Sequence, residues 1–141
     1  MYLFDITINF LGILIAAAVY FLLGNLWYSK SLFGKVWRHH EGLHPVEPYQ
    51  PSVGAYIGEF VIALIIAYIF DLLMILTSAN GVVDGLILAS WIWVGFIATT
   101  QLSAVLWGKK TFKSFLIHDG FILCGFLLIG FILGFMKEYS F

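Results

Sequence analysis

Polar side chains interrupt the apolar stretches of this chain, and six of them are its best candidates for chemistry. They are Asn25, Glu59, Asp71, Gln101, His118 and Asp119. A carboxylate or an imidazole held out of water can take up and release a proton near neutral pH, and an amide can hydrogen-bond a passing solute. Two other interpretations stay open: a structural hydrogen-bond network between helices, and side chains that simply reach the lipid headgroups.

A pair of histidines in a polar segment has the spacing of metal ligands. His40 and His44 lie four residues apart, and two imidazoles at that spacing on a helix can share a metal ion. Gly42 and Pro45 disfavour a helix there, and no second histidine cluster completes the ligand set. We therefore expect a solvated loop, with no metal and no cofactor. Motifs of hydrolases, phosphate-binding loops and dinucleotide-binding folds are also missing from the sequence, which favours a protein that is not an enzyme and leaves the question of enzymatic activity open.

Four apolar stretches hold the polar residues and determine their solvent. They cover residues 6–28, 56–76, 85–106 and 115–135, and each is close to the ~20 residues that a helix needs to cross a bilayer. The chain is 62% hydrophobic and 11% charged, whereas a soluble domain carries about 25% charged residues. Its net charge of −1 gives no general attraction to nucleic acid. The sequence predicts an all-α integral membrane protein, a single domain over residues 1–141, with four transmembrane helices in an up-and-down bundle.

The basic residues predict the orientation of this bundle. Six of the seven Lys and Arg residues lie between the first and second stretches or between the third and fourth. Because short basic loops stay in the cytoplasm, these two connections are predicted to lie on the cytoplasmic side of the cell (inner) membrane. Both termini are then predicted to lie outside. Residues 31–38 also place apolar side chains on one helical face, which predicts a short interfacial helix in the first loop.

Most of the candidate residues are predicted to lie at a similar depth in the membrane. Counted at about 1.5 Å per residue, five of them lie within roughly 8 Å of the inner boundary: Asn25, Glu59, Gln101, His118 and Asp119. This predicts a polar layer in the cytoplasmic half of the bundle. Asp71 lies near the outer end of the second stretch, where no Lys or Arg is expected. It is predicted to be protonated, to cap a neighbouring helix or to bind a cation.

Small residues recur every fourth position, as in Gly81-x-x-x-Gly85 and Gly130-x-x-x-Gly134. Such spacings let helix backbones approach closely, within one bundle or between protomers. A single four-helix unit leaves little room for an aqueous path. Besides the lipid bilayer, we therefore expect a second copy of the chain or another membrane protein as a partner.

Three segments carry a resemblance to a known family. The first is Leu26-Trp27-Tyr28-Ser29, followed by Leu32-Phe33-Gly34-Lys35 and Trp37; the second is Trp93-Val94-Gly95-Phe96; the third runs from Phe115 to Gly120 and contains Asp119. In these segments the chain resembles the bacterial membrane proteins known as domain of unknown function 1761, although Lys30 stands where members usually have proline. The resemblance implies a small four-helix integral membrane protein and no established reaction.

The leading functional hypothesis is permeation of a small solute or an ion, with coupling to protons as one variant, through the polar layer in the cytoplasmic half. The runner-up is a non-catalytic partner or scaffold subunit that docks another membrane protein through its glycine faces or its first loop. A metal-dependent membrane enzyme that uses the first-loop histidines is the third.

Overall fold

The computed structural model describes residues 7–29 and 52–139, and every regular element in this part of the chain is a helix. The helices are α1 (Phe10–Trp27), α3 (Val53–Leu76), α4 (Val82–Ile92), the π-helical segment η1 (Trp93–Ala98), α5 (Thr99–Leu106) and α6 (Phe112–Glu138). Because α4, η1 and α5 follow without a break, the described residues form four long helices, each long and apolar enough to cross a membrane. The predicted all-α fold is thus confirmed for the described residues.

Side-chain caps determine where three of the helices begin. Asn9, Ser52 and Thr111 each accept a hydrogen bond from the backbone N–H three residues further on, at 2.9–3.1 Å. The last two caps start α3 and α6 at residues 53 and 112 rather than at the predicted 56 and 115. Hydropathy marks apolar surface, whereas a helix starts where its first N–H groups find acceptors, so the sequence prediction began too late.

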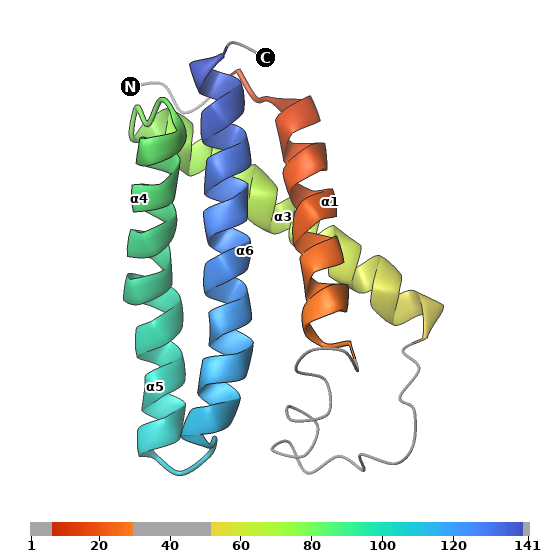
Figure 1. Ribbon diagram of the computed structural model, residues 1–141, viewed down its shortest axis with the longest axis vertical. Helices are drawn as coiled ribbons and strands as arrows, with labels where there is room; N and C mark the ends of the chain where they lie inside the picture. The colour runs from red at the N-terminus through yellow and green to blue at the C-terminus, as the bar shows by residue number, and fades with distance from the viewer. Residues whose placement is uncertain (1–6, 30–51, 140–141) are drawn as a thin grey trace.

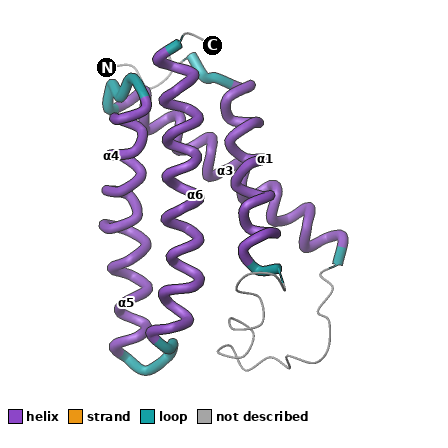
Figure 2. The backbone as a smooth tube through the Cα atoms, in the orientation of Figure 1, coloured by secondary structure: helices purple, strands orange, loops and turns teal. Residues whose placement is uncertain are grey.

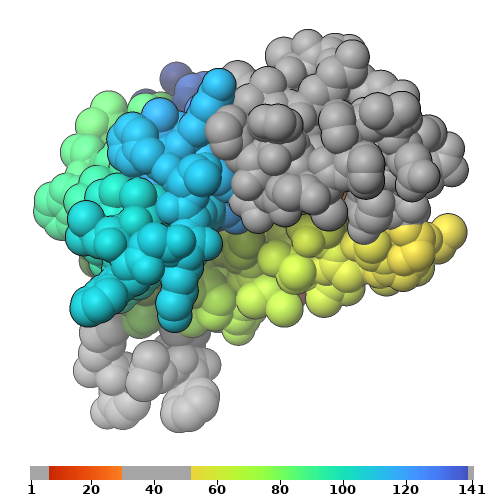
Figure 3. All heavy atoms as spheres, turned by 90° about the horizontal axis from the view of Figure 1, so that it is seen from below, coloured from red at the N-terminus to blue at the C-terminus, as the bar shows by residue number. Residues whose placement is uncertain are grey.

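The helices alternate in direction along the chain, and α6 is the most enclosed of them (Figures 1 and 2). It packs along α4 on one side and along α1 on the other, while α3 crosses the bundle obliquely and contacts mainly α1. Seen from below, the first turns of α3 lie well away from α5 and from the start of α6 (Figure 3). The first ten residues of α3 are therefore exposed or only half-buried.

Glycines close the contact between α4 and α6. A Cβ atom on Gly85 would overlap the carbonyl oxygen of Gly130, and one on Gly130 would overlap that of Gly85. One turn away, Gly134 meets the carbonyl of Gly81 just as closely, and Gly81 has φ +125°, which other residues rarely adopt. The small-residue spacings in these two helices thus close the bundle within a single chain.

The core is built around the upper half of α6, in the orientation of Figure 1. Ile129 and Leu133 are fully buried in one cluster with four fully buried alanines of α1 and α3, which are Ala16, Ala17, Ala63 and Ala67. Small side chains let the crossing helices approach each other closely. Large apolar side chains also cover the outside of the molecule: Trp91, Phe96 and Leu106 are 73%, 71% and 84% exposed.

Candidate functional site

The backbone of α6 is held from two sides at one level, near the turn that joins α5 to α6. Trp27, the last residue of α1, donates its indole N–H to the carbonyl of Ile117 at 2.9 Å. Trp93, the first residue of η1, donates its indole N–H to the carbonyl of Asp119 at 2.8 Å. Three helices therefore meet at Ile117–Asp119, and their contacts fix the positions of the His118 and Asp119 side chains.

Asp119 is fully buried, and its carboxylate faces a lysine without accepting a good hydrogen bond. Lys110 Nζ lies 3.6 Å from Asp119 Oδ2, and it donates instead to Gln101 Oε1 at 3.1 Å. Among the described residues, neither carboxylate oxygen of Asp119 has a hydrogen-bond partner. Since buried polar atoms are almost always hydrogen-bonded, this carboxylate has unused capacity to bind a cation or a donor.

His118 lies beside Asp119 in the chain but contacts a different helix. Its Nδ1 is 2.6 Å from the hydroxyl of Tyr28, and which of the two groups donates depends on the imidazole tautomer. The ring of Tyr28 also packs edge-on against Phe121, with centroids 5.6 Å apart. This contact ties the end of α1 to α6. An imidazole and a phenol in hydrogen-bond contact can also exchange a proton.

We use the name lower site for the group formed by Trp27, Tyr28, Trp93, Gln101, Lys110, His118 and Asp119. It contains three of the five residues predicted to form a polar layer. Asn25 is exposed on α1, where its Nδ2 donates to the carbonyl of Phe21 in its own helix at 2.9 Å.

Glu59, the remaining residue of the predicted layer, is exposed on α3. It shares a helical face with Ala63 and Phe70, which are buried further along the helix. Towards its N-terminus, however, α3 diverges from α6 (Figure 1). The oblique crossing of α3 leaves no signal in hydropathy, so the sequence could not predict that Glu59 lies outside the lower site.

Asp71 belongs to a second buried ion pair, at the upper end, where α1 begins and α6 ends. Its Oδ1 lies 3.2 Å from Lys137 Nζ, and its Oδ2 accepts a hydrogen bond at 3.2 Å from the backbone N–H of Asn9, the N-cap residue of α1. The expectation that Asp71 lacks a cationic partner was wrong. The fourth helix extends to Glu138 instead of ending at residue 135, and the extra turn brings Lys137 to Asp71.

The last turn of α6 also reaches α4. Glu138 Oε2 accepts a hydrogen bond from the backbone N–H of Val82 at 3.1 Å, which satisfies a donor at the N-terminus of α4. Lys137 and Glu138 thus tie α6 to α3 and to α4 from consecutive positions. In the sequence both residues lie beyond the fourth apolar stretch, and hydropathy predicts a role for neither.

The three segments that carry the family resemblance meet at the lower site. Trp27 and Tyr28 come from the first segment, Trp93 from the second, and His118 and Asp119 from the third. In the sequence, Trp27 stands out only as part of the family signature, and nothing predicts its contact with α6. Lys110 stands out only as a charge that sets orientation. The spacing of residues along the chain does not reveal contacts between helices that are far apart in the sequence. The family resemblance was therefore the one sequence signal that linked these three segments.

Residues 11–134 match the family described as "Protein of unknown function (DUF1761)". The chain belongs to this family. No curated protein and no solved structure matches the chain significantly. The matched region contains the whole lower site and Asp71 of the upper pair, but family membership supplies no reaction for either.

Two sequence hypotheses fall on residues 30–51, outside the described part of the chain. They are the interfacial helix at residues 31–38 and the histidine pair His40 and His44. Within residues 7–29 and 52–139, no group of three or more His, Cys, Asp or Glu side chains is arranged to hold a metal ion.

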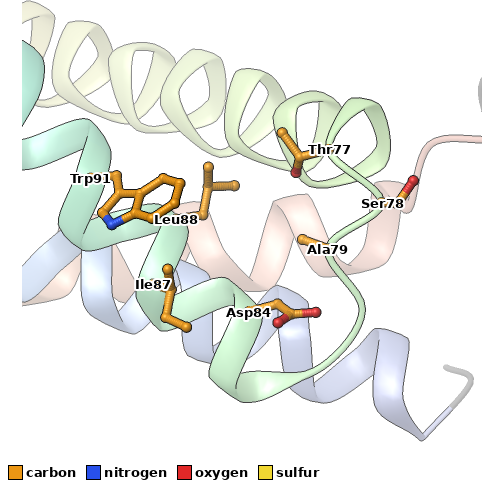
Figure 4. Close-up of a pocket in the computed structure, with 7 residues that line it drawn as sticks. All are labelled: Thr77, Ser78, Ala79, Asp84, Ile87, Leu88 and Trp91. Atoms are coloured by element: carbon orange, nitrogen blue, oxygen red, sulfur yellow. The ribbon is translucent and has the colours of Figure 1, made fainter.

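A shallow hollow lies on the opposite end of the molecule from the lower site. It is formed by the turn after α3, with Thr77 and Ser78, and by α4, where Asp84 in the first turn and Trp91 in the last turn border it (Figure 4). Its volume of about 240 Å³ is below the roughly 300–1,000 Å³ of typical small-molecule sites. None of the predicted site residues lines it.

Proposed function

We propose that this protein is a multi-pass protein of the inner membrane, with both termini outside, and that its lower site serves the permeation of an ion or a small solute. Exposed apolar side chains on all of its long helices support membrane insertion, because soluble monomers rarely expose large contiguous apolar patches. Lys109, Lys110 and Lys113 at the α5–α6 turn favour a cytoplasmic position for that end.

The observation that carries the proposal is the state of the Asp119 carboxylate. It is fully buried, it lies where three helices meet, and no described residue donates a hydrogen bond to it. Ionisable residues inside membrane helices are costly, and they commonly mark the paths of ions and protons. By comparison, the other buried carboxylate among the described residues, Asp71, accepts a backbone hydrogen bond at one oxygen and has only its Oδ1 without a hydrogen-bond partner.

Permeation along one protomer would have to pass the apolar core. Asp119 and Lys137 lie 18 residues apart on α6, which corresponds to five turns and about 27 Å. Ile129 and Leu133 lie between them and are fully buried. We therefore propose that the pathway is completed between protomers, or with another membrane protein. Docking through Gly81, Gly85, Gly130 and Gly134 has no support, because these residues already pack against each other within one chain.

The test is ion flux into liposomes that contain the purified protein. Imposed gradients of protons, Na⁺ and K⁺ would be compared for the wild type, Asp119→Asn and Glu59→Gln. Glu59 is the matched control, since it lies at a similar depth on an apolar helix but is exposed and outside the lower site. We expect flux in the wild type and in Glu59→Gln, and its loss in Asp119→Asn. Absence of flux in the wild type, or equal flux in all three proteins, would contradict the proposal.

Orientation is tested separately by fusing reporters to the C-terminus. A reporter that is active only outside the cytoplasm should be active in this fusion, and one that is active only in the cytoplasm should not. The opposite result would place the lysines of the α5–α6 turn outside and would remove the basis for a cytoplasmic lower site.

A further inference from the structure

We propose that the ion bound at the lower site is a proton, which competes with the ammonium group of Lys110 for the Asp119 carboxylate. The inference deepens the proposed function, because it names the ion for the same residue. It concerns proton binding, however, and is tested by an experiment that does not depend on the flux assay.

The neighbours of Asp119 favour a proton over a metal cation. Ions such as Ca²⁺ and Mg²⁺ take about six or more oxygen ligands. The groups that the structure places near Asp119 are instead donors: the ammonium of Lys110 at 3.6 Å from the carboxylate, and the indole N–H of Trp93, which is bonded to the backbone carbonyl. Neither donor can serve as a metal ligand. The nearby amide oxygen of Gln101 already accepts from Lys110. A proton needs a single carboxylate oxygen, and both oxygens of Asp119 have that capacity.

Lys110 connects the buried carboxylate to water. Its side chain is 16% exposed, and it belongs to the turn between α5 and α6, so it can leave the ion pair without unwinding a helix. In the exchange, a proton from water forms an O–H bond with an Asp119 oxygen. Lys110 keeps its own proton, so the net charge of the pair rises from zero to +1, and the released ammonium stays with Gln101 and water.

The charged groups that act on Asp119 come from two directions. Lys110 faces it from the turn, and His118 acts on it from the neighbouring position on α6. Tyr28 of α1 bears on it indirectly, through its hydrogen bond to His118. Protonation of His118 would oppose proton binding at Asp119, so a His118→Gln variant must be measured beside the wild type.

The experiment measures how readily Lys110 reacts with an amine-acylating reagent in the protein reconstituted in lipid. Peptide mass spectrometry would give the acylation of Lys110 divided by that of Lys109, which is exposed on the same turn and corrects for the reagent's own pH dependence. Between about pH 8 and about pH 5, the ratio should rise about fivefold, since a partly exposed ion pair restrains an amine by a factor of that order. Replacing choline by Na⁺ or K⁺ at constant pH should leave the ratio unchanged.

Asp119→Asn supplies the matched control, because its neutral amide imitates the protonated acid. Its ratio should be high at every pH, while His118→Gln should keep the rise. The inference would be overturned if the acylation ratio of the wild type did not change with pH, or if it rose with Na⁺ or K⁺. It would also be overturned if His118→Gln lost the rise of the ratio at low pH. If Asp119→Asn does not fold, the pH and Na⁺ series on the wild type decide alone. Failure of the flux assay with a positive result here would remove the permeation proposal and leave the proton site standing.

Discussion

The two buried ion pairs of this protein have the same composition but differ in how completely they are satisfied. Each joins a fully buried aspartate to a lysine whose side chain is mostly buried, 18% exposed at the upper pair and 16% at the lower. At the upper pair, Lys137 approaches to 3.2 Å and a backbone N–H donates to the second oxygen of Asp71. At the lower pair, Lys110 stays at 3.6 Å and no described residue donates to Asp119. The Asp71 carboxylate accepts one hydrogen bond, and its Oδ1 has no hydrogen-bond partner among the described residues, whereas neither oxygen of Asp119 has one. We therefore interpret the first pair as a structural ion pair and propose the second as a binding site.

Both pairs lie along the same face of α6, so they can be compared within one helix. A separation of 18 residues is five helical turns, so Asp119 and Lys137 share that face. At the upper end α6 supplies the lysine and α3 the acid, while at the lower end α6 supplies the acid and the preceding turn supplies the lysine. The lysine at the lower end is therefore held by a turn, which can move more easily than a packed helix.

The largest effect is expected from Asp71→Ala. This substitution leaves Lys137 and the backbone N–H of Asn9 without their acceptor, at the point where α1, α3 and α6 are joined. Breaking a buried pair costs about 3–5 kcal/mol, and because Lys137 keeps some contact with water we expect about 3 kcal/mol. Reversible unfolding in detergent micelles would measure the loss of unfolding free energy. A loss of unfolding free energy below about 1 kcal/mol would mean that the upper pair does not stabilise the contact between these helices.

The contact between α4 and α6 should matter next, because it positions Trp93 against the lower site. In Gly85→Ala the new Cβ overlaps the carbonyl oxygen of Gly130, and backbone cannot move aside as a side chain can. We expect a destabilisation of about 1–3 kcal/mol. Gly95→Ala is the matched control on the same long helix, since nothing lies within 4 Å of its added Cβ. If the control lost as much stability as Gly85→Ala, close approach of α4 and α6 would not be the cause.

The sequence predicted the helices of this fold better than it predicted their contacts. Hydropathy located four membrane-length helices, because burial in lipid requires continuous apolar runs. It also placed Gln101, His118 and Asp119 at one level. It could not foresee that α3 crosses the bundle and leaves Glu59 exposed, since crossing angles depend on packing such as that of the buried alanines. It missed Lys137 as the partner of Asp71, because the end of an apolar run is not the end of a helix.

A smaller effect is expected when an indole contact at the lower site is removed. Trp93→Phe keeps the aromatic ring but removes the N–H that donates to the carbonyl of Asp119. The loss of unfolding free energy should be about 1 kcal/mol, the usual contribution of one hydrogen bond. Trp91→Phe is the control, because Trp91 is 73% exposed on the same long helix. Equal stability of the two variants would show that the indole does not hold α6 in place.

The smallest change in stability is expected from Asp119→Asn, although the same substitution should abolish flux. The amide has nearly the shape of the carboxylate and removes a buried charge that no hydrogen bond compensates, while Lys110 keeps Gln101 and water as partners. Because Lys110 keeps these partners and the 3.6 Å contact is that of a weak ion pair, the unfolding free energy should change by less than about 0.5 kcal/mol. Asp71→Asn is the matched substitution at the upper pair. It loses the contact at 3.2 Å with Lys137, and we expect it to cost about 1–2 kcal/mol. Equal losses of unfolding free energy in both asparagine variants would contradict the distinction between a structural ion pair and a binding site. Asp119 would then be no stronger a candidate for a functional residue than Asp71.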